Sequence, residues 1–121
     1  MVKVLIVDDS MTQRQLMSSV LEQVGLTVLV ATDGVEAWEQ IQRVQPDIVV
    51  LDIIMPRMNG YEVCRKIKSD PSMNHLPVVM CSSKAEEFDR YWGMKQGADA
   101  YLSKPFQPTE LLSTIQKLLQ G

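Results

Sequence analysis

The segment Ile48-Val49-Val50-Leu51-Asp52 decides the fold, because it holds four consecutive apolar residues that end at a carboxylate. A short, unbroken apolar run is typical of a strand buried on both faces of a sheet. The same pattern opens the chain, where the run from Val4 to Val7 ends at Asp8 and Asp9. The sequence therefore predicts two buried strands, each followed by acids.

Outward from these runs, strand patterns alternate with helical ones. Further strands are predicted over 28–31, 78–81 and 100–102, and helices over about 11–24, 35–45, 61–69, 85–96 and from Pro108 onward. The first helix is expected to present Leu16, Val20 and Val24, with Met17 and Leu21 beside them. Five strands alternating with five helices predict an α/β fold, a doubly wound parallel sheet with helices on both faces.

Composition agrees with a small folded domain. The 121 residues suit one domain spanning 1–121, with 45% hydrophobic and 22% charged residues. The net charge is −3, whereas binding to nucleic-acid phosphates requires an excess of positive charge. Direct nucleic-acid binding is therefore not expected. The chain shows neither a signal peptide nor a run of about 20 apolar residues, so we expect a cytoplasmic protein without membrane insertion.

Polar residues collect where the predicted strands end. In doubly wound sheets, ligands bind beyond the carboxyl ends of the strands. The residues at these ends are Asp8, Asp9, Asp52, Ser82, Ser83 and Lys104. Taken singly, an acid at a strand end is usually a helix cap or a turn residue. Their coincidence at adjoining strand ends favours a functional site.

Three neighbouring carboxylates require a compensating cation. At about 4 Å and an effective dielectric near 20, each pair would cost about 4 kcal/mol. Mg²⁺ suits a few carboxylates and several waters, and Lys104 offers a second positive charge. Acid, metal, ammonium and hydroxyl together describe a phosphoryl site in which a carboxylate serves as the nucleophile.

The chain resembles the receiver domain of bacterial two-component response regulators from Lys3 to the last helix. Asp8-Asp9 resembles the acidic metal-binding pair of that family. Asp52, followed by Met55-Pro56 and Gly60, resembles the phospho-acceptor and its loop. Further matches are the hydroxyl residue Ser82, the aromatic switch residue Tyr101 and the Lys104-Pro105 motif. The resemblance implies a flavodoxin-like fold with strand order 2-1-3-4-5.

The resemblance also implies a role for each matched position. Asp52 would accept phosphate from a phosphohistidine on a sensor histidine kinase. Direct Mg²⁺ ligands would be Asp9, Asp52 and the backbone carbonyl of Ile54, with Asp8 acting through water. Lys104 and Ser82 would contact the phosphoryl group, and the bond before Pro105 would be cis. The pattern alone does not decide whether Ser82 or Ser83 supplies this hydroxyl, and the spacing to Lys104 favours Ser82.

The implied switch connects the phosphoryl group to a protein partner. New charge on Asp52 would draw Ser82 inward, and Tyr101 would rotate from exposed to buried. That rotation would change the face formed by the helix near 85–96, the strand near 100–102 and the final helix, where a downstream output protein would bind. With no second domain expected after Gly121, output would depend on protein contact.

Two further patterns refine the expectation. The Trp-Gly-x-x-Gln-Gly-Ala pattern from Trp92 to Ala98 resembles the small receivers of type IV pilus chemosensory systems, which govern twitching motility or phototaxis. Trp92 itself is equally consistent with a core anchor. Ile54 and Lys84 replace polar and acidic residues found in some relatives beside the path of the hydrolytic water, so we expect an altered phosphate lifetime.

Three other functions share parts of this pattern. A phosphohydrolase with an aspartyl-phosphate intermediate would use the same logic, but Ile54 occupies the place of its usual general acid. A flavin-binding module would need a phosphate-binding loop where Asp8-Asp9 would repel phosphate. A receiver acting as a phosphorylation-independent scaffold remains an alternative, although every expected site position is present.

Overall fold

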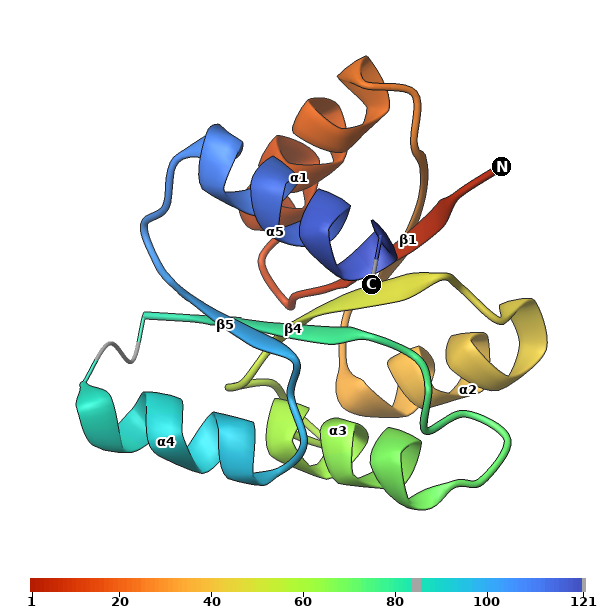
Figure 1. The fold of residues 1–121 in the computed structure, drawn as a ribbon, viewed down its shortest axis with the longest axis vertical. Helices are drawn as coiled ribbons and strands as arrows, with labels where there is room; N and C mark the ends of the chain where they lie inside the picture. Colours follow the sequence, from red (N-terminus) through yellow and green to blue (C-terminus); the bar gives the residue numbers. More distant parts are fainter. Residues whose placement is uncertain (84–85, 121) are drawn as a thin grey trace.

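The predicted apolar runs form a five-stranded parallel sheet. The computed structural model describes residues 1–83 and 86–120 (Figure 1). Its strands are β1 (Lys3–Val7), β2 (Thr27–Ala31), β3 (Ile48–Asp52), β4 (Val78–Ser82) and β5 (Ala100–Ser103). Its helices are α1 (Met11–Gln23), α2 (Gly34–Val44), α3 (Gly60–Ser69), α4 (Glu87–Lys95) and α5 (Pro108–Gln120). The strand order is β2-β1-β3-β4-β5, which confirms the predicted flavodoxin-like topology.

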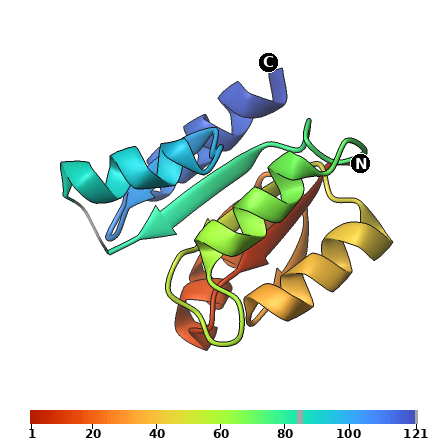
Figure 2. The ribbon, with the colours of Figure 1, turned by 90° about the horizontal axis from the view of Figure 1, so that it is seen from below.

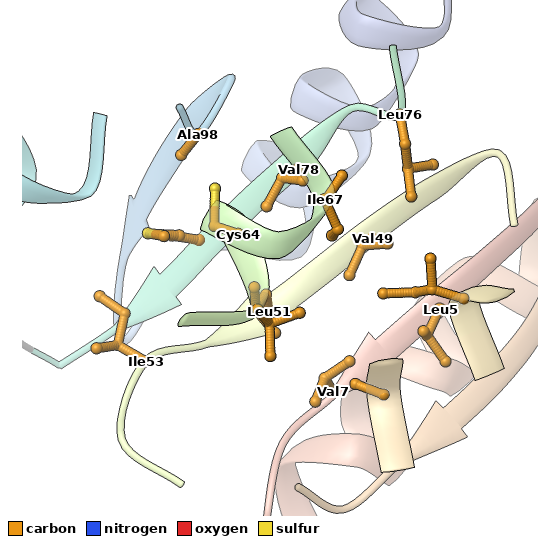
Figure 3. Close-up of a cluster of buried hydrophobic side chains, with 14 of the residues drawn as sticks. Leu5, Val7, Val49, Leu51, Ile53, Cys64, Ile67, Leu76, Val78 and Ala98 are labelled. Carbon is orange, nitrogen blue, oxygen red and sulfur yellow. The ribbon is translucent and has the colours of Figure 1, made fainter. Parts of the chain in front are cut away.

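Helices cover both faces of the sheet (Figures 1 and 2). On one face, α1 and α5 bury Met17, Leu21, Leu111 and Ile115 against the strands. On the other, α2 and α3 bury Ala37, Ile41, Val63, Cys64 and Ile67, and Figure 3 shows part of this second cluster. Since both faces are covered, the central strands need apolar residues at consecutive positions, which explains the unbroken runs.

The strand register brings the carboxyl ends of the strands to one edge of the sheet. Val7 is paired with Leu51, so Asp8 follows β1 at the level where β3 reaches Asp52. Asp52 is in turn paired with Cys81, one residue before Ser82. Side chains distant in the sequence therefore meet at this edge.

The first helix turns a different stripe toward the core than expected. Met17 and Leu21 are buried, whereas Leu16 and Val24 are each 57% exposed. Of the five apolar positions predicted for this helix, Met17 and Leu21 therefore face the core, Val20 is half-buried, and the prediction is wrong for Leu16 and Val24. The buried stripe lies one position along, because α1 packs against both the sheet and α5.

The described part of helix α4 lies within the predicted range 85–96. The predicted start at Ala85 lies outside the described residues, as does Lys84, and α4 as described begins at Glu87. Trp92 is 41% exposed, so it is not a core anchor. Its neighbour Gly93 makes the close contact with the sheet instead. None of the described helices is both long and apolar enough to cross a lipid bilayer.

Candidate functional site

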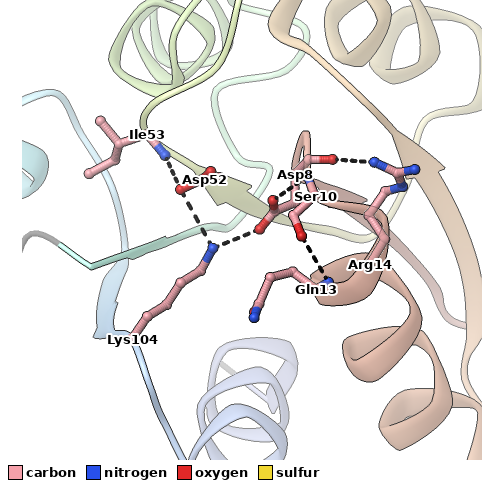
Figure 4. A network of polar contacts seen from close by, with 7 residues as sticks. All are labelled: Asp8, Ser10, Gln13, Arg14, Asp52, Ile53 and Lys104. Carbon is pink, nitrogen blue, oxygen red and sulfur yellow. Dashed lines mark hydrogen bonds and ion pairs between the residues drawn. The ribbon is translucent and has the colours of Figure 1, made fainter.

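Asp8 is a buried carboxylate with a donor on each oxygen. Its Oδ2 accepts a hydrogen bond of 2.7 Å from Lys104 Nζ, and its Oδ1 accepts one of 2.9 Å from the Ser10 amide (Figure 4). Arg14 donates to the Asp8 carbonyl at 2.8 Å. Ser10 also caps α1 by accepting from the Gln13 amide. These bonds hold Asp8 in one orientation at the end of β1.

Asp52 ends β3 beside Asp8 and is partly shielded from water. Its Oδ1 accepts from the Ile53 amide at 2.9 Å and lies 3.7 Å from Lys104 Nζ. Burial raises the pKa of Asp52 to about 6, with Asp8 and Asp9 adding to the rise and Lys104 opposing it. The carboxylate is therefore costly to ionise unless further positive charge is present.

Lys104 supplies the fixed positive charge of the site. Its backbone amide donates to the Ser82 carbonyl at 2.7 Å, which ties the end of β5 to that of β4. The Lys104–Pro105 bond is cis, as the resemblance implies. Burial would lower the pKa of Lys104, but the hydrogen bond to Asp8 and the charge of Asp52 outweigh it and raise the pKa. Lys104 is therefore protonated at neutral pH.

The acidic cluster fits a hard divalent cation. One oxygen of each of Asp8, Asp9 and Asp52 lies within 4.8 Å of the others. Asp9 is exposed, while Asp8 is buried and Asp52 half-buried, so one side of the cluster is open to water. All these donors are oxygens, the ligand type of Mg²⁺, and the raised pKa of Asp52 marks a demand for positive charge.

Ser82 and Tyr101 lie together beside this cluster. Ser82 is 1% exposed at the end of β4, whereas Ser83 is exposed. Burial raises the pKa of Tyr101, and a hydrogen bond with the Ser82 side chain opposes the rise. Tyr101 is 5% exposed, so it already lies inward, and the expected exposed starting position is not the one described.

Helix α4 provides the space and the contacts for the inward ring of Tyr101. A Cβ added to Gly93 would lie 3.0 Å from Tyr101 Cδ2, so the ring packs directly on the helix backbone. Arg90 donates to the Tyr101 carbonyl at 3.0 Å, and its guanidinium lies 5.2 Å from the ring centroid. Sequence reasoning missed both residues, although the Trp-Gly pattern marked the position of Gly93.

A second feature missed from the sequence joins Arg57 and Asp33. Asp33 is buried, caps α2 and forms an ion pair with Arg57 at 2.9 Å. Arg57 has a positive φ of 70°. The two residues are 24 positions apart in the sequence, and neither an aspartate nor an arginine by itself indicates that they form an ion pair.

Comparison with known proteins is consistent with this geometry. Residues 4–116 match the response regulator receiver domain family. Protein PilG of Pseudomonas aeruginosa is 42% identical over 94% of this chain and 84% of its own length. Protein PilH of the same organism is 38% identical over the full length of both chains.

Solved structures of response regulators and their receiver domains have the same fold as this chain. The chemotaxis protein CheY4 of Vibrio cholerae superposes with a TM-score of 0.90 at 35% identity, over 98% of each chain. The Francisella response regulator 1452 receiver domain gives a TM-score of 0.92 at 30% identity, over 99% of this chain and 98% of that one. With this match of sequence, fold and acidic edge, the chain belongs to the response regulator receiver domain family.

Proposed function

We propose that this chain is a single-domain response regulator that accepts a phosphoryl group on Asp52 from a sensor histidine kinase in a Mg²⁺-dependent reaction. The observation that carries the proposal is the grouping of Asp8, Asp9 and Asp52 within 4.8 Å, with the Lys104 ammonium 2.7 Å from Asp8 and 3.7 Å from Asp52. A nucleophilic carboxylate, a metal-type acid pair and a fixed cation are the parts that phosphoryl transfer needs.

The chemistry assigns one task to each side chain. An Asp52 oxygen attacks phosphorus, the bond to the histidine nitrogen breaks, and that nitrogen leaves with the bonding electrons. Asp8, Asp9, Asp52 and the Ile54 carbonyl would hold Mg²⁺, which when bound offsets charge on the phosphoryl oxygens. Lys104 supplies a second positive charge, and Ser82 supplies a hydroxyl donor.

The output step would pass through Ser82 and Tyr101 to the surface. Their hydrogen bond and the packing of Tyr101 on Gly93 support a coupling between the site and α4. We propose that phosphorylation stabilises the inward arrangement by giving Ser82 an anionic partner, which shifts the population rather than creating a new state. A downstream protein would read the face of α4, β5 and α5.

The biological setting is proposed from similarity. The similar proteins include PilG and PilH, and the structural neighbour CheY4 is a chemotaxis protein. Together with the Trp92–Ala98 pattern, these relatives support a role in motility control, with pilus-based movement as the favoured setting.

The first experiment is intact mass after incubation with acetyl phosphate, with and without Mg²⁺. We expect one added phosphoryl group in the parent, dependent on Mg²⁺ and absent in Asp52→Asn. Asp47→Asn is a matched control, because it makes the same change just before the other end of β3. It should be phosphorylated like the parent.

The outcomes separate the alternatives. A parent that binds Mg²⁺ in a titration but gains no mass would contradict the phospho-acceptor and favour a scaffold. Phosphorylation that persists in Asp52→Asn would move the acceptor to another residue. Release of many phosphate ions per chain without any detectable phosphorylated protein would favour a phosphohydrolase.

A further inference from the structure

A fork-shaped ion pair fastens the loop after Asp52 to the start of α2. Arg57 Nε donates to Asp33 Oδ2 at 3.0 Å, and Arg57 Nη2 lies 2.9 Å and 3.1 Å from the two carboxylate oxygens. Asp33 also accepts from the Glu36 amide, and this bond, together with Arg57, holds the pKa of Asp33 below its usual value. Both partners are therefore charged at neutral pH.

The tip of this loop is in a conformation that its sequence does not favour by itself. Arg57 has a φ of 70°, in the left-handed region that residues with a Cβ disfavour. The Met58 amide donates to the Pro56 carbonyl at 2.8 Å and closes a tight turn around Arg57. A Cβ added to Gly34 would lie 2.0 Å from the Met58 carbonyl oxygen, so the loop backbone lies directly on α2.

The base of the same loop is fixed beside the acceptor. The Gly60 amide donates to the Ile53 carbonyl at 2.8 Å, and a Cβ on Gly60 would lie 2.3 Å from the Asp52 carbonyl oxygen. Ile54, whose carbonyl is the proposed metal ligand, lies between this base and the tip. Its side chain is 59% exposed and so provides little anchoring of its own.

We propose that Arg57, through its ion pair with Asp33, is a positioning residue that holds the loop of residues 53–59 in the conformation that binds Mg²⁺. The inference rests on the proposed function, since it concerns the same metal site. Arg57 contacts neither substrate nor metal and acts through the backbone of its loop.

The charge of Arg57 and its positioning role predict opposite changes in Mg²⁺ affinity when the residue is replaced. Removing a cation from the neighbourhood of a divalent ion should strengthen Mg²⁺ binding. Removing the clamp should weaken it, because Ile54 would then lose its fixed place. The sign of the change in Arg57→Gly therefore separates positioning from simple charge.

The experiment is a calorimetric Mg²⁺ titration of the full chain for Arg57→Gly, Asp33→Asn and the double variant. Glycine accepts the left-handed backbone, and asparagine keeps an oxygen that can cap α2. We expect Mg²⁺ affinity to fall about 3- to 10-fold in each single variant, less than for a direct partner of a ligand side chain. The double variant should bind no more weakly than the weaker single variant, because one interaction is lost in each.

Lys68→Met is the matched control. It removes the Lys68–Asp99 ion pair of 2.9 Å at the opposite end of β4, and Mg²⁺ affinity should stay at the parent value. Unchanged or tighter binding in Arg57→Gly would overturn the positioning role while leaving the proposed function intact. A parent that binds no Mg²⁺ would overturn both.

Discussion

The Lys104 ammonium lies 2.7 Å from a carboxylate oxygen of Asp8 but 3.7 Å from one of Asp52. The lysine thus makes its shorter contact with an acid of the proposed metal pair and not with the proposed acceptor. Its contact with Asp52 is the weaker of the two, which leaves the acceptor carboxylate partly uncompensated.

Replacing Lys104 with methionine should separate metal binding from phosphoryl transfer. Mg²⁺ should bind at least as tightly, because a competing cation is lost from Asp8. Phosphorylation by acetyl phosphate at saturating Mg²⁺ should slow about 100-fold, because a fixed charge on the transferring group is removed. Titration and intact mass measure the two effects, with the exposed Lys117→Met as the control for net charge. Weakened Mg²⁺ binding would show that Lys104 shapes the site and does more than supply charge.

Asp52 should make the metal-free protein less stable as the pH rises. Its pKa is about 6 in the folded protein against 3.8 for the ordinary group, so the folded state binds more protons between these values. The free energy of unfolding should therefore fall from about pH 4 to about pH 6 and stay lower above it. After allowance for partial exposure, the loss should be about 1–2 kcal/mol. Urea unfolding of parent and Asp52→Asn without divalent ions tests this, and parallel pH curves would contradict it.

Gly93→Ala should displace Tyr101 without unfolding the protein. The new methyl would lie 3.0 Å from both the Met80 sulfur and the Tyr101 ring, while α4 gains about 1 kcal/mol of helix propensity. We expect the Tyr101 signal in fluorotyrosine NMR, assigned with Tyr101→Phe, to become accessible to a soluble paramagnetic agent. Met94→Ala, at the exposed next position, should leave it unchanged. A protected signal in Gly93→Ala would mean that Met80 alone absorbs the contact.

Ile54→Asn should shorten the life of the aspartyl phosphate several-fold. Ile54 is exposed beside Asp52 and offers no side-chain hydrogen bond to a water, whereas an amide can orient one. Loss of the added mass over time, after removal of the phosphodonor, gives the decay rate. Ile54→Val provides a control without a polar group. Equal decay in Ile54→Asn and the parent would remove any role for this position in hydrolysis.

The sequence predicted the sheet well because central parallel strands leave a strong signal. Buried on both faces, β1, β3 and β4 need consecutive apolar residues, and the acids Asp8 and Asp52 stand out at their ends. The stripe of α1 was harder to predict. Leu16 and Met17 begin competing apolar series at the same spacing, and the position of the helix on the sheet decides between them.

The contacts missed from the sequence depend on backbone path and side-chain orientation. Arg57 reaches Asp33 from a backbone with positive φ, and arginine gives no hint of that conformation. The inward position of Tyr101 depends on the absence of a side chain at Gly93 on another element. Spacing along the chain encodes neither relationship.

The hydrogen bond between Lys104 and Asp8 joins residues 96 positions apart in the sequence. Asp8 follows the first strand, Asp52 ends the middle one and Lys104 follows the last, so the charges of the site come together only in the folded sheet. A partly folded regulator would lack the charge balance needed to accept a phosphoryl group.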